Sequence, residues 1–321
     1  MTYELRPITP DDRAAVSSMT FPAYRHLLAL DAVPRHPEQG DARPIQPIGI
    51  AAWDGDRAVG LALAELPTTS DGAPELLSLF VVESARRQGV ARALVSALER
   101  EVAVHGFPSL QAVYTTGKPE IAAIERIFAA AGWQAPTARA VIVRFSPEQA
   151  LSTPWFGRLR FPGDEFEILS WTDVRADERE ALMHEQQAEH WIPVGLEPWR
   201  HDATGFDTTS SVGLRHKGRL AGWVINHRVS PDTVRFTCSW MRGDMRGMAR
   251  ILPLYTESLR RLLASGTCRT CMFITPIEYT GMVEFVKRRC AKWGTFFGET
   301  RGTMKTGLRV DAPPVPAGLG L

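Results

Sequence analysis

The feature that most constrains the fold is an apolar run followed at once by a glycine-containing turn and an amphipathic segment. The apolar run covers residues 76–82 and is interrupted only by Ser78, a composition typical of a strand buried on both faces. The turn reads Arg86-Arg87-Gln88-Gly89-Val90-Ala91, and apolar residues then recur at helical spacing from Val90 to Val102. The sequence therefore predicts a buried strand that leads through a tight turn into a helix.

This turn has the properties of an anion-binding site. Gly89 and the small Ala91 let the backbone approach a ligand, while the free amides and the positive dipole end of the first helical turn face an anion. Arg87 and Arg92 add positive charge. Because a glycine before a helix is often only a turn, the loop by itself is also compatible with a structural role. The ligand indicated is a pyrophosphate group.

Regular elements are predicted on both sides of the turn in the N-terminal half. A strand at 3–7, helices at 14–19 and 21–28, a proline-rich loop at 33–47 and a hairpin at 48–64 precede it. A strand at 110–114, a helix at 120–131 that ends at Gly132, and a strand at 140–145 follow it.

The second half repeats this order of elements. Strands are predicted at 166–171, 212–229 (a hairpin), 233–241 and 271–275, helices at 177–187, 248–263 and 281–292, and a final pair of strands near 296–297 and 304–310. We therefore expect an α/β protein with mixed α+β sheets and two domains. Residues 1–150 form the first domain, 151–163 a linker, 164–310 the second domain and 311–321 a disordered tail.

The amino-acid composition limits the classes of binding partner that the protein is expected to have. The 37 Lys and Arg residues balance 36 Asp and Glu residues, so no global field favours nucleic acid or an acidic membrane surface. The N-terminus lacks the pattern of a secretory signal, and no apolar run approaches the roughly 20 residues of a membrane span, which predicts a cytoplasmic protein. Cys268-Arg269-Thr270-Cys271 has the spacing of half a zinc site, but no second ligand pair follows, so no metal is predicted and the four cysteines are expected to be reduced thiols.

On these residues the chain resembles the GNAT superfamily of N-acetyltransferases, whose signature is Gln/Arg-x-x-Gly-x-Gly/Ala between the fourth strand and the third helix. Arg86, Gly89 and Ala91 match that signature, although Glu83 stands where a proline is common. The resemblance implies two tandem GNAT-like domains, each a mixed, mostly antiparallel sheet flanked by helices. In the second half the corresponding turn, 244–249, begins with Asp244, whose carboxylate would repel pyrophosphate, so this copy is expected to be degenerate.

The resemblance also implies the donor, acetyl-CoA, as co-substrate. Its pantetheine arm would lie where the fourth and fifth strands separate, with the Leu79 amide donating to the thioester carbonyl as an oxyanion-type contact. The residues expected to bind it are Leu79, Phe80, Val81, Val82, Arg86, Arg87, Gln88, Gly89, Val90, Ala91 and Arg92.

Glu75 and Tyr114 are the candidates for proton transfer. By its spacing to the signature, Glu75 corresponds to a glutamate base of the family, but a structural or substrate-positioning role is equally compatible. Phe128 stands where the family often has a tyrosine that protonates the thiolate. Tyr114 is the nearest substitute, a tyrosine packed against a neighbour is the alternative, and water or the substrate ammonium could also supply the proton.

Acceptor recognition in the family comes from the first two helices, which here suggests Tyr24, Arg25 and His26; an ordinary solvated helix face is the alternative. The predicted function is acetyl transfer from acetyl-CoA to an amine of a small molecule or peptide, by direct attack in a ternary complex, in a monomer or homodimer. Two alternatives stay open: a longer acyl thioester on CoA or a carrier protein as donor, and a non-catalytic CoA-binding sensor.

Overall fold

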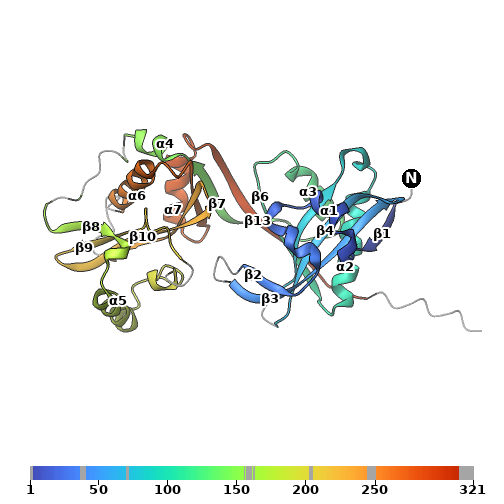
Figure 1. The fold of residues 1–321 in the computed structure, drawn as a ribbon, viewed down its shortest axis with the longest axis horizontal. Helices are drawn as coiled ribbons and strands as arrows, with labels where there is room; N and C mark the ends of the chain where they lie inside the picture. The colour runs from blue at the N-terminus through green and yellow to red at the C-terminus, as the bar shows by residue number, and fades with distance from the viewer. Residues whose placement is uncertain are drawn as a thin grey trace, which may run out of the picture. The chain divides into compact units, whose positions relative to one another are not determined.

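The chain forms two compact units in a computed structural model that describes residues 3–36, 41–69, 72–154, 156, 161, 163–201, 205–243 and 251–310 (Figure 1). The first unit contains the described residues up to Ala138 and those from Thr300 onward, and the second is Arg139–Glu299. Each unit is a mixed sheet with helices on its faces, which confirms the predicted fold class. No helix within the described ranges has the length and apolar character needed to cross a membrane.

The sheet of the first unit has the strand order β1-β3-β4-β5-β6-β13, with β2 paired to β3. The strands are β1 (Glu4–Pro7), β2 (Val33–His36), β3 (Asp41–Asp54), β4 (Arg57–Pro67), β5 (Glu75–Val81), β6 (Ser109–Thr115) and β13 (Phe296–Thr306). Neighbours run antiparallel except β5 and β6, which are parallel. The predicted hairpin turns at Gly55, which has a φ of 58°.

Helices cover both faces of this sheet. One face carries α2 (Val90–Val104) and α3 (Ile121–Ala130), and the other carries α1 (Arg13–Val16) with the 3-10 segments η1 (Pro10–Asp12), η2 (Ser17–Met19) and η3 (Pro22–Ala29). In α2 the predicted apolar stripe, including Leu94 and Leu98, is fully buried against the sheet. Burying each such side chain contributes about 1.5–3 kcal/mol, so packing fixes the helix that follows the turn.

The described residues of the proline-rich stretch, 33–36 and 41–47, do not form the predicted loop. They form β2 and the start of β3, with Val33 opposite Ile45 and Pro34 opposite Pro44. Because β2 is an edge strand, the missing N–H of proline removes no bond that the ladder needs. The prediction was wrong because prolines at a sheet edge resemble those of a loop in sequence.

The sheet of the second unit has the order β7-β12-β11-β10-β9-β8. The strands are β7 (Thr137–Phe145), β8 (Phe166–Ser170), β9 (Val212–His216), β10 (Arg219–Ser230), β11 (Thr233–Met241) and β12 (Thr270–Pro276). Only β11 and β12 are parallel. One face packs α4 (Pro147–Ser152), α6 (Leu252–Ser265), α7 (Thr280–Phe285) and the π-helical η9 (Val286–Cys290), and the other packs α5 (Ala176–Glu189) and η7 (Pro198–His201).

The last strand of each sequence half completes the sheet of the other unit. β7, at the end of the predicted first domain, pairs with β12 from Phe145–Cys271 to Ala140–Pro276. The C-terminal part of β13, Thr300–Thr306, pairs with β6, and β13 is one strand rather than the predicted pair. The compact units therefore differ from a continuous division at residue 150, because hydrogen bonding between distant strands, and not chain order, assigns these two strands. The predicted tail, 311–321, lies outside the described residues, as do residues 155, 157–160 and 162 of the predicted linker.

Candidate active site

A cleft opens in the first unit where β5 and β6 separate. The two strands pair only at Glu75–Gln111 and Leu76–Ala112. A β-bulge on β5 leaves Leu77 without a partner on β4 and re-aims the strand at this point. Beyond it lies a cavity of about 1150 Å³, lined by β5, β6, the turn before α2, the start of α2 and one side of α3.

The backbone of β5 presents free polar groups to this cavity. The Val82 N–H donates to the Val59 carbonyl on β4 at 2.9 Å. Because bonded pairs alternate along an antiparallel ladder, the backbone groups of Phe80 also point toward β4, and those of Leu79 and Val81 point away from it. At these positions β6 has already diverged, so an extended ligand could pair with Leu79 and Val81 in its place.

The predicted anion-binding turn forms one end of the cavity. Gly89 is the N-cap of α2 with a φ of 82°, and Arg87 is also left-handed with a φ of 61°. A Cβ built on Gly89 would meet no atom within 4 Å, so the space above the turn is open. The first amides of α2 have no helical acceptor, and together with left-handed residues they make the kind of concave backbone surface that binds anions.

The charge of the lining is strongly positive. Its cationic side chains are Arg86, Arg87, Arg92, Lys118 and Arg126, against one carboxylate, that of Glu120. The Arg86 Nε donates to the Val81 carbonyl at 3.1 Å, so this side chain covers one of the exposed backbone groups of β5. Charge and backbone geometry both fit a ligand with a polyanionic end and an extended neutral arm.

Nine of the eleven predicted donor-binding residues line the cavity; Val82 and Gln88 do not. The Gln88 amide instead accepts from the Tyr3 hydroxyl at 2.8 Å and donates to the Ser84 carbonyl at 2.9 Å. Lys118, which lies before α3, and Arg126, which lies on it, also line the cavity but were not among the residues predicted from the sequence. Basic residues around the helix after the fifth strand were the signal that could have found them.

Glu75 lies beside the cavity but is not part of its lining. It stands opposite Glu65 on β4, and like charges so placed repel each other. Arg35 of β2 bridges the two carboxylates, with its Nη2 2.8 Å from the Glu75 Oε2 and its Nε paired with Glu65. Gln111 donates to the same Glu75 oxygen at 3.3 Å. The predicted base is thus held by an arginine that lies 40 residues away in the chain and that no local pattern places there.

Tyr114 lines the cavity, but its hydroxyl is engaged. It donates to the Glu125 Oε1 at 2.9 Å, and Arg301 of β13 contacts the same oxygen at 2.9 Å. Burial, together with the bond to Glu125, raises the pKa of the Tyr114 phenol. Phe128 also lines the cavity and stacks on Trp133 with ring centroids 4.5 Å apart.

Of the predicted acceptor residues, only Tyr24 lines the cavity. It packs edge-to-face on Phe21 at 6.0 Å, and the Lys118 ammonium lies 5.4 Å from the centre of the Phe21 ring. Arg25 donates to the Ser17 carbonyl at 3.1 Å, and His26 is exposed. Burial raises the pKa of Tyr24, with a further contribution from the nearby Glu75 carboxylate, which keeps the phenol neutral.

The corresponding strands of the second unit stay together for longer. β11 and β12 form four successive pairs, from Thr233–Thr270 to Phe236–Phe273, where β5 and β6 form two. Phe236, Phe273 and Tyr255 pack against one another at centroid distances of 5.0 to 5.5 Å. The degenerate turn expected at 244–249 lies outside the described residues.

Sequence comparison agrees with this geometry. The profile of the family described as the acetyltransferase (GNAT) family matches residues 17–129, a range that includes β5, the anion-binding turn, α2 and β6. Over these residues the chain is similar to the GNAT acetyltransferase family. No curated protein matches its sequence.

Solved structures extend the GNAT fold over both units. A tandem GNAT protein from the clavulanic acid biosynthesis pathway superposes with a TM-score of 0.59 at 16% identity, covering 95% of this chain and 99% of that one. A GCN5-related N-acetyltransferase from Sphaerobacter thermophilus gives 0.56 at 15% identity, covering 95% of each chain. A glucosamine N-acetyltransferase region of a fungal multi-domain GH3 β-N-acetylglucosaminidase gives 0.57 at 15% identity over 94% of this chain and 38% of that one. Both units of the chain therefore have the GNAT fold.

Proposed function

We propose that the first unit binds acetyl-CoA and transfers its acetyl group to an amine of a small molecule or peptide in a ternary complex. The observation that carries this proposal is the separation of β5 and β6, which leaves the backbone groups of Leu79 and Val81 facing a cavity with a cationic end. We further propose that the protein acts in the cytoplasm, as a monomer or homodimer, with no nucleic-acid or membrane partner.

In this proposal the turn binds the pyrophosphate of the donor, and β5 binds its pantetheine arm and thioester. The amides from Gly89 to Arg92 and the guanidinium of Arg87 hold the pyrophosphate. Val81 pairs with the pantetheine arm once Arg86 releases its carbonyl. Bound acetyl-CoA supplies an activated thioester, and the Leu79 N–H donates to its carbonyl oxygen, a contact that strengthens as negative charge develops there.

Proton transfer needs two groups. An alkyl ammonium is mostly protonated near neutral pH and must lose a proton before it attacks. Glu75 is the proposed base. It would act through a water molecule, because its carboxylate lies outside the cavity lining and is bound to Arg35. Tyr114 is the proposed donor to the departing thiolate, which requires its hydroxyl to turn from Glu125 toward the cavity. Tyr24 is the proposed contact for the acceptor.

A longer acyl group is a second candidate donor, and one observation favours it. Apart from Arg126, the side chains of α3 that line the cavity are apolar, and the large ones are Ile121, Ile124, Ile127 and Phe128. Such a wall buries methylene groups favourably, at about 0.8 kcal/mol for each one removed from water.

One experiment separates these candidates. The full chain is incubated with acetyl-, butyryl- and octanoyl-CoA against a polyamine, an aminoglycoside, an amino acid and a short peptide, and thiol release is followed. We expect acetyl-CoA to be consumed fastest with one class of amine. Faster turnover of octanoyl-CoA would support the longer donor. Tight CoA binding with no thiol release from any pair would contradict both and support a sensor.

A further inference from the structure

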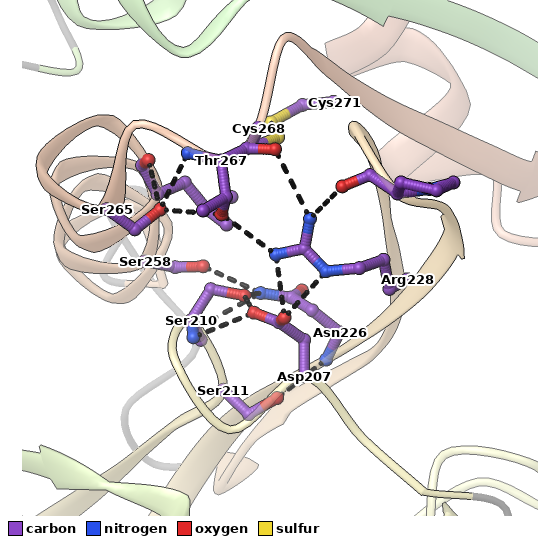
Figure 2. A network of polar contacts seen from close by, with 12 residues as sticks. Asp207, Ser210, Ser211, Asn226, Arg228, Ser258, Ser265, Thr267, Cys268 and Cys271 are labelled. Carbon is purple, nitrogen blue, oxygen red and sulfur yellow. Dashed lines mark hydrogen bonds and ion pairs between the residues drawn. The ribbon is translucent and has the colours of Figure 1, made fainter.

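Two cysteines that the proposed reaction does not use lie together in the second unit. Cys268 and Cys271 stand where the chain passes from α6 into β12, and their sulfur atoms are 3.8 Å apart (Figure 2). Both are buried. In the described part of the chain no third histidine, cysteine, aspartate or glutamate joins them in a metal-ligand arrangement. The pair is therefore a vicinal dithiol rather than part of a recognisable metal site.

An arginine stands beside this dithiol. Arg228 of β10 donates to the Thr267 carbonyl at 3.4 Å and to its hydroxyl at 3.3 Å, and it pairs with Asp207 at 3.0 Å (Figure 2). The Asp207 carboxylate fixes the guanidinium on one side, while the other side faces the segment that carries Cys268. The guanidinium is thus held against Thr267, the residue before Cys268, before any reaction begins.

The two sulfurs have different acidities. The hydrogen bond from the Cys271 thiol, with a contribution from the Arg228 charge, lowers the pKa of Cys268. The same contact and burial raise the pKa of Cys271. A thiolate is the reactive form of cysteine toward oxidants, so Cys268 has the character of an attacking sulfur and Cys271 that of a thiol that resolves the product.

A buried polar network holds α6 against β10 around the pair. The Asn226 Nδ2 donates to the Ser258 Oγ of α6 at 2.7 Å and to the Ser210 Oγ at 2.9 Å (Figure 2). Asn226 and both serines are fully buried. These hydrogen bonds between buried side chains hold β10 and α6 together beside the two cysteines.

We propose that Cys268 and Cys271 are a redox modification site that a hydroperoxide converts into an intramolecular disulfide. The Cys268 thiolate attacks the peroxide oxygen, which breaks the O–O bond, forms a sulfenic acid and releases hydroxide, or from an organic peroxide an alkoxide that takes a proton from water. The Cys271 thiol then attacks the sulfenic sulfur and releases water. The two thiols lose two electrons and two protons, and the peroxide is reduced. The sulfurs close from 3.8 Å to a bond of about 2.05 Å.

The other two cysteines provide matched controls. Burial raises the pKa of Cys238 and of Cys290 to about 12, and neither has a sulfur partner among the described contacts. Cys238 donates to the Leu196 carbonyl at 3.1 Å. Both are expected to stay reduced when Cys268 and Cys271 are oxidised.

The test uses the full chain treated with hydrogen peroxide, then denatured, alkylated and digested with trypsin. Arg269 separates the two cysteines, so cleavage after it leaves them on different peptides in the reduced protein. We expect the oxidised protein to yield these two peptides joined by a disulfide, about 2 Da lighter than their sum, and to release them after reduction. Four alkylated thiols after peroxide, or a disulfide that includes Cys238 or Cys290, would overturn the proposal.

Variants test the assigned roles. Cys271→Ser should leave a sulfenic acid at Cys268 that a dimedone probe captures, Cys268→Ser should remove both products, and Cys290→Ser should behave as wild type. Arg228→Gln should slow disulfide formation severalfold, whereas Arg219→Gln, an exposed arginine on the same strand, should not. A dimedone adduct at Cys271 in the Cys268→Ser variant, or an unchanged rate in Arg228→Gln, would contradict this mechanism.

Discussion

At the residue scale, Gly89 allows a left-handed backbone conformation and leaves the space above the turn open for a ligand. These two roles can be tested separately. Its φ of 82° is a conformation that side chains with a Cβ rarely adopt, and the space above it is open toward the cavity. Room for a side chain exists, so any effect of substitution must come from backbone strain or from interference with a ligand. An aspartate at this position and at a glycine of similar φ outside the cavity strain the backbone alike, but only the first places a negative charge at the ligand site.

Gly89→Asp is expected to abolish measurable CoA binding, a loss of roughly a hundredfold or more, since it places a carboxylate where amides should meet pyrophosphate. Isothermal calorimetry against CoA measures this, and wild type should bind one equivalent per chain. Gly106→Asp is the matched control, because Gly106 has a φ of 85° and the same open surroundings but lies outside the cavity. Equal affinity in the two variants would contradict the assignment.

At the scale of elements, the cleft exists because β5 keeps its ladder with β4 while it loses the one with β6. Leu79 and Val81 pair opposite β4 residues in the register, but their backbone groups point to the cavity. A change at the Leu79 amide therefore affects the ligand side of the strand and leaves the hydrogen bonds to β4 intact.

Leu79→Pro removes this N–H, whereas Leu79→Ala shortens the side chain to a similar extent and keeps it. We expect the proline variant to remain folded and to lose thiol release by about two to three orders of magnitude, the range typical of a lost oxyanion-type donor. The alanine variant should retain most activity. Circular dichroism and single-turnover kinetics provide the two measurements, and equal rates in both variants would show that the Leu79 amide is not used.

At the scale of the whole molecule, the exchanged terminal strands make each sequence half depend on the other. Thr300–Thr306 pair with all of β6, the strand that forms one wall of the cavity. Arg301 in this segment also reaches Glu125 of α3, the partner of Tyr114. The end of the chain thus supports the proposed active site from a distance of more than a hundred residues in sequence.

A chain that ends at Glu299 should therefore fail to fold its first unit, although it retains every residue of the predicted first domain. Loss of the β13 segment leaves β6 as an unpaired edge. A chain that ends at Val310 keeps the strand and is the control. We expect thermal melting by circular dichroism to show the first unit unfolded, or melting well below the control, and CoA binding to disappear. Normal CoA binding by the shorter chain would contradict this dependence.

The sequence alone determined the features that are local in the chain. Residues 76–102 specify a buried strand, a glycine turn and an amphipathic helix through periodicity and backbone preference, and these are present as β5, the anion-binding turn and α2. The same signals located most other helices and strands, and the resemblance to the GNAT signature located the nine lining residues among those predicted for the donor. Each of these depends on neighbours within a few turns, which is why the order of residues suffices.

Only the tertiary structure decided the features that depend on distant partners. Arg35 meets Glu75, and Arg301 meets Glu125, across long stretches of sequence, and no local pattern specifies such pairs. The exchange of β7 and β13 has the same origin: a strand carries the signal of its own extended conformation, but its partner is chosen by the burial and hydrogen bonding of the complete sheet.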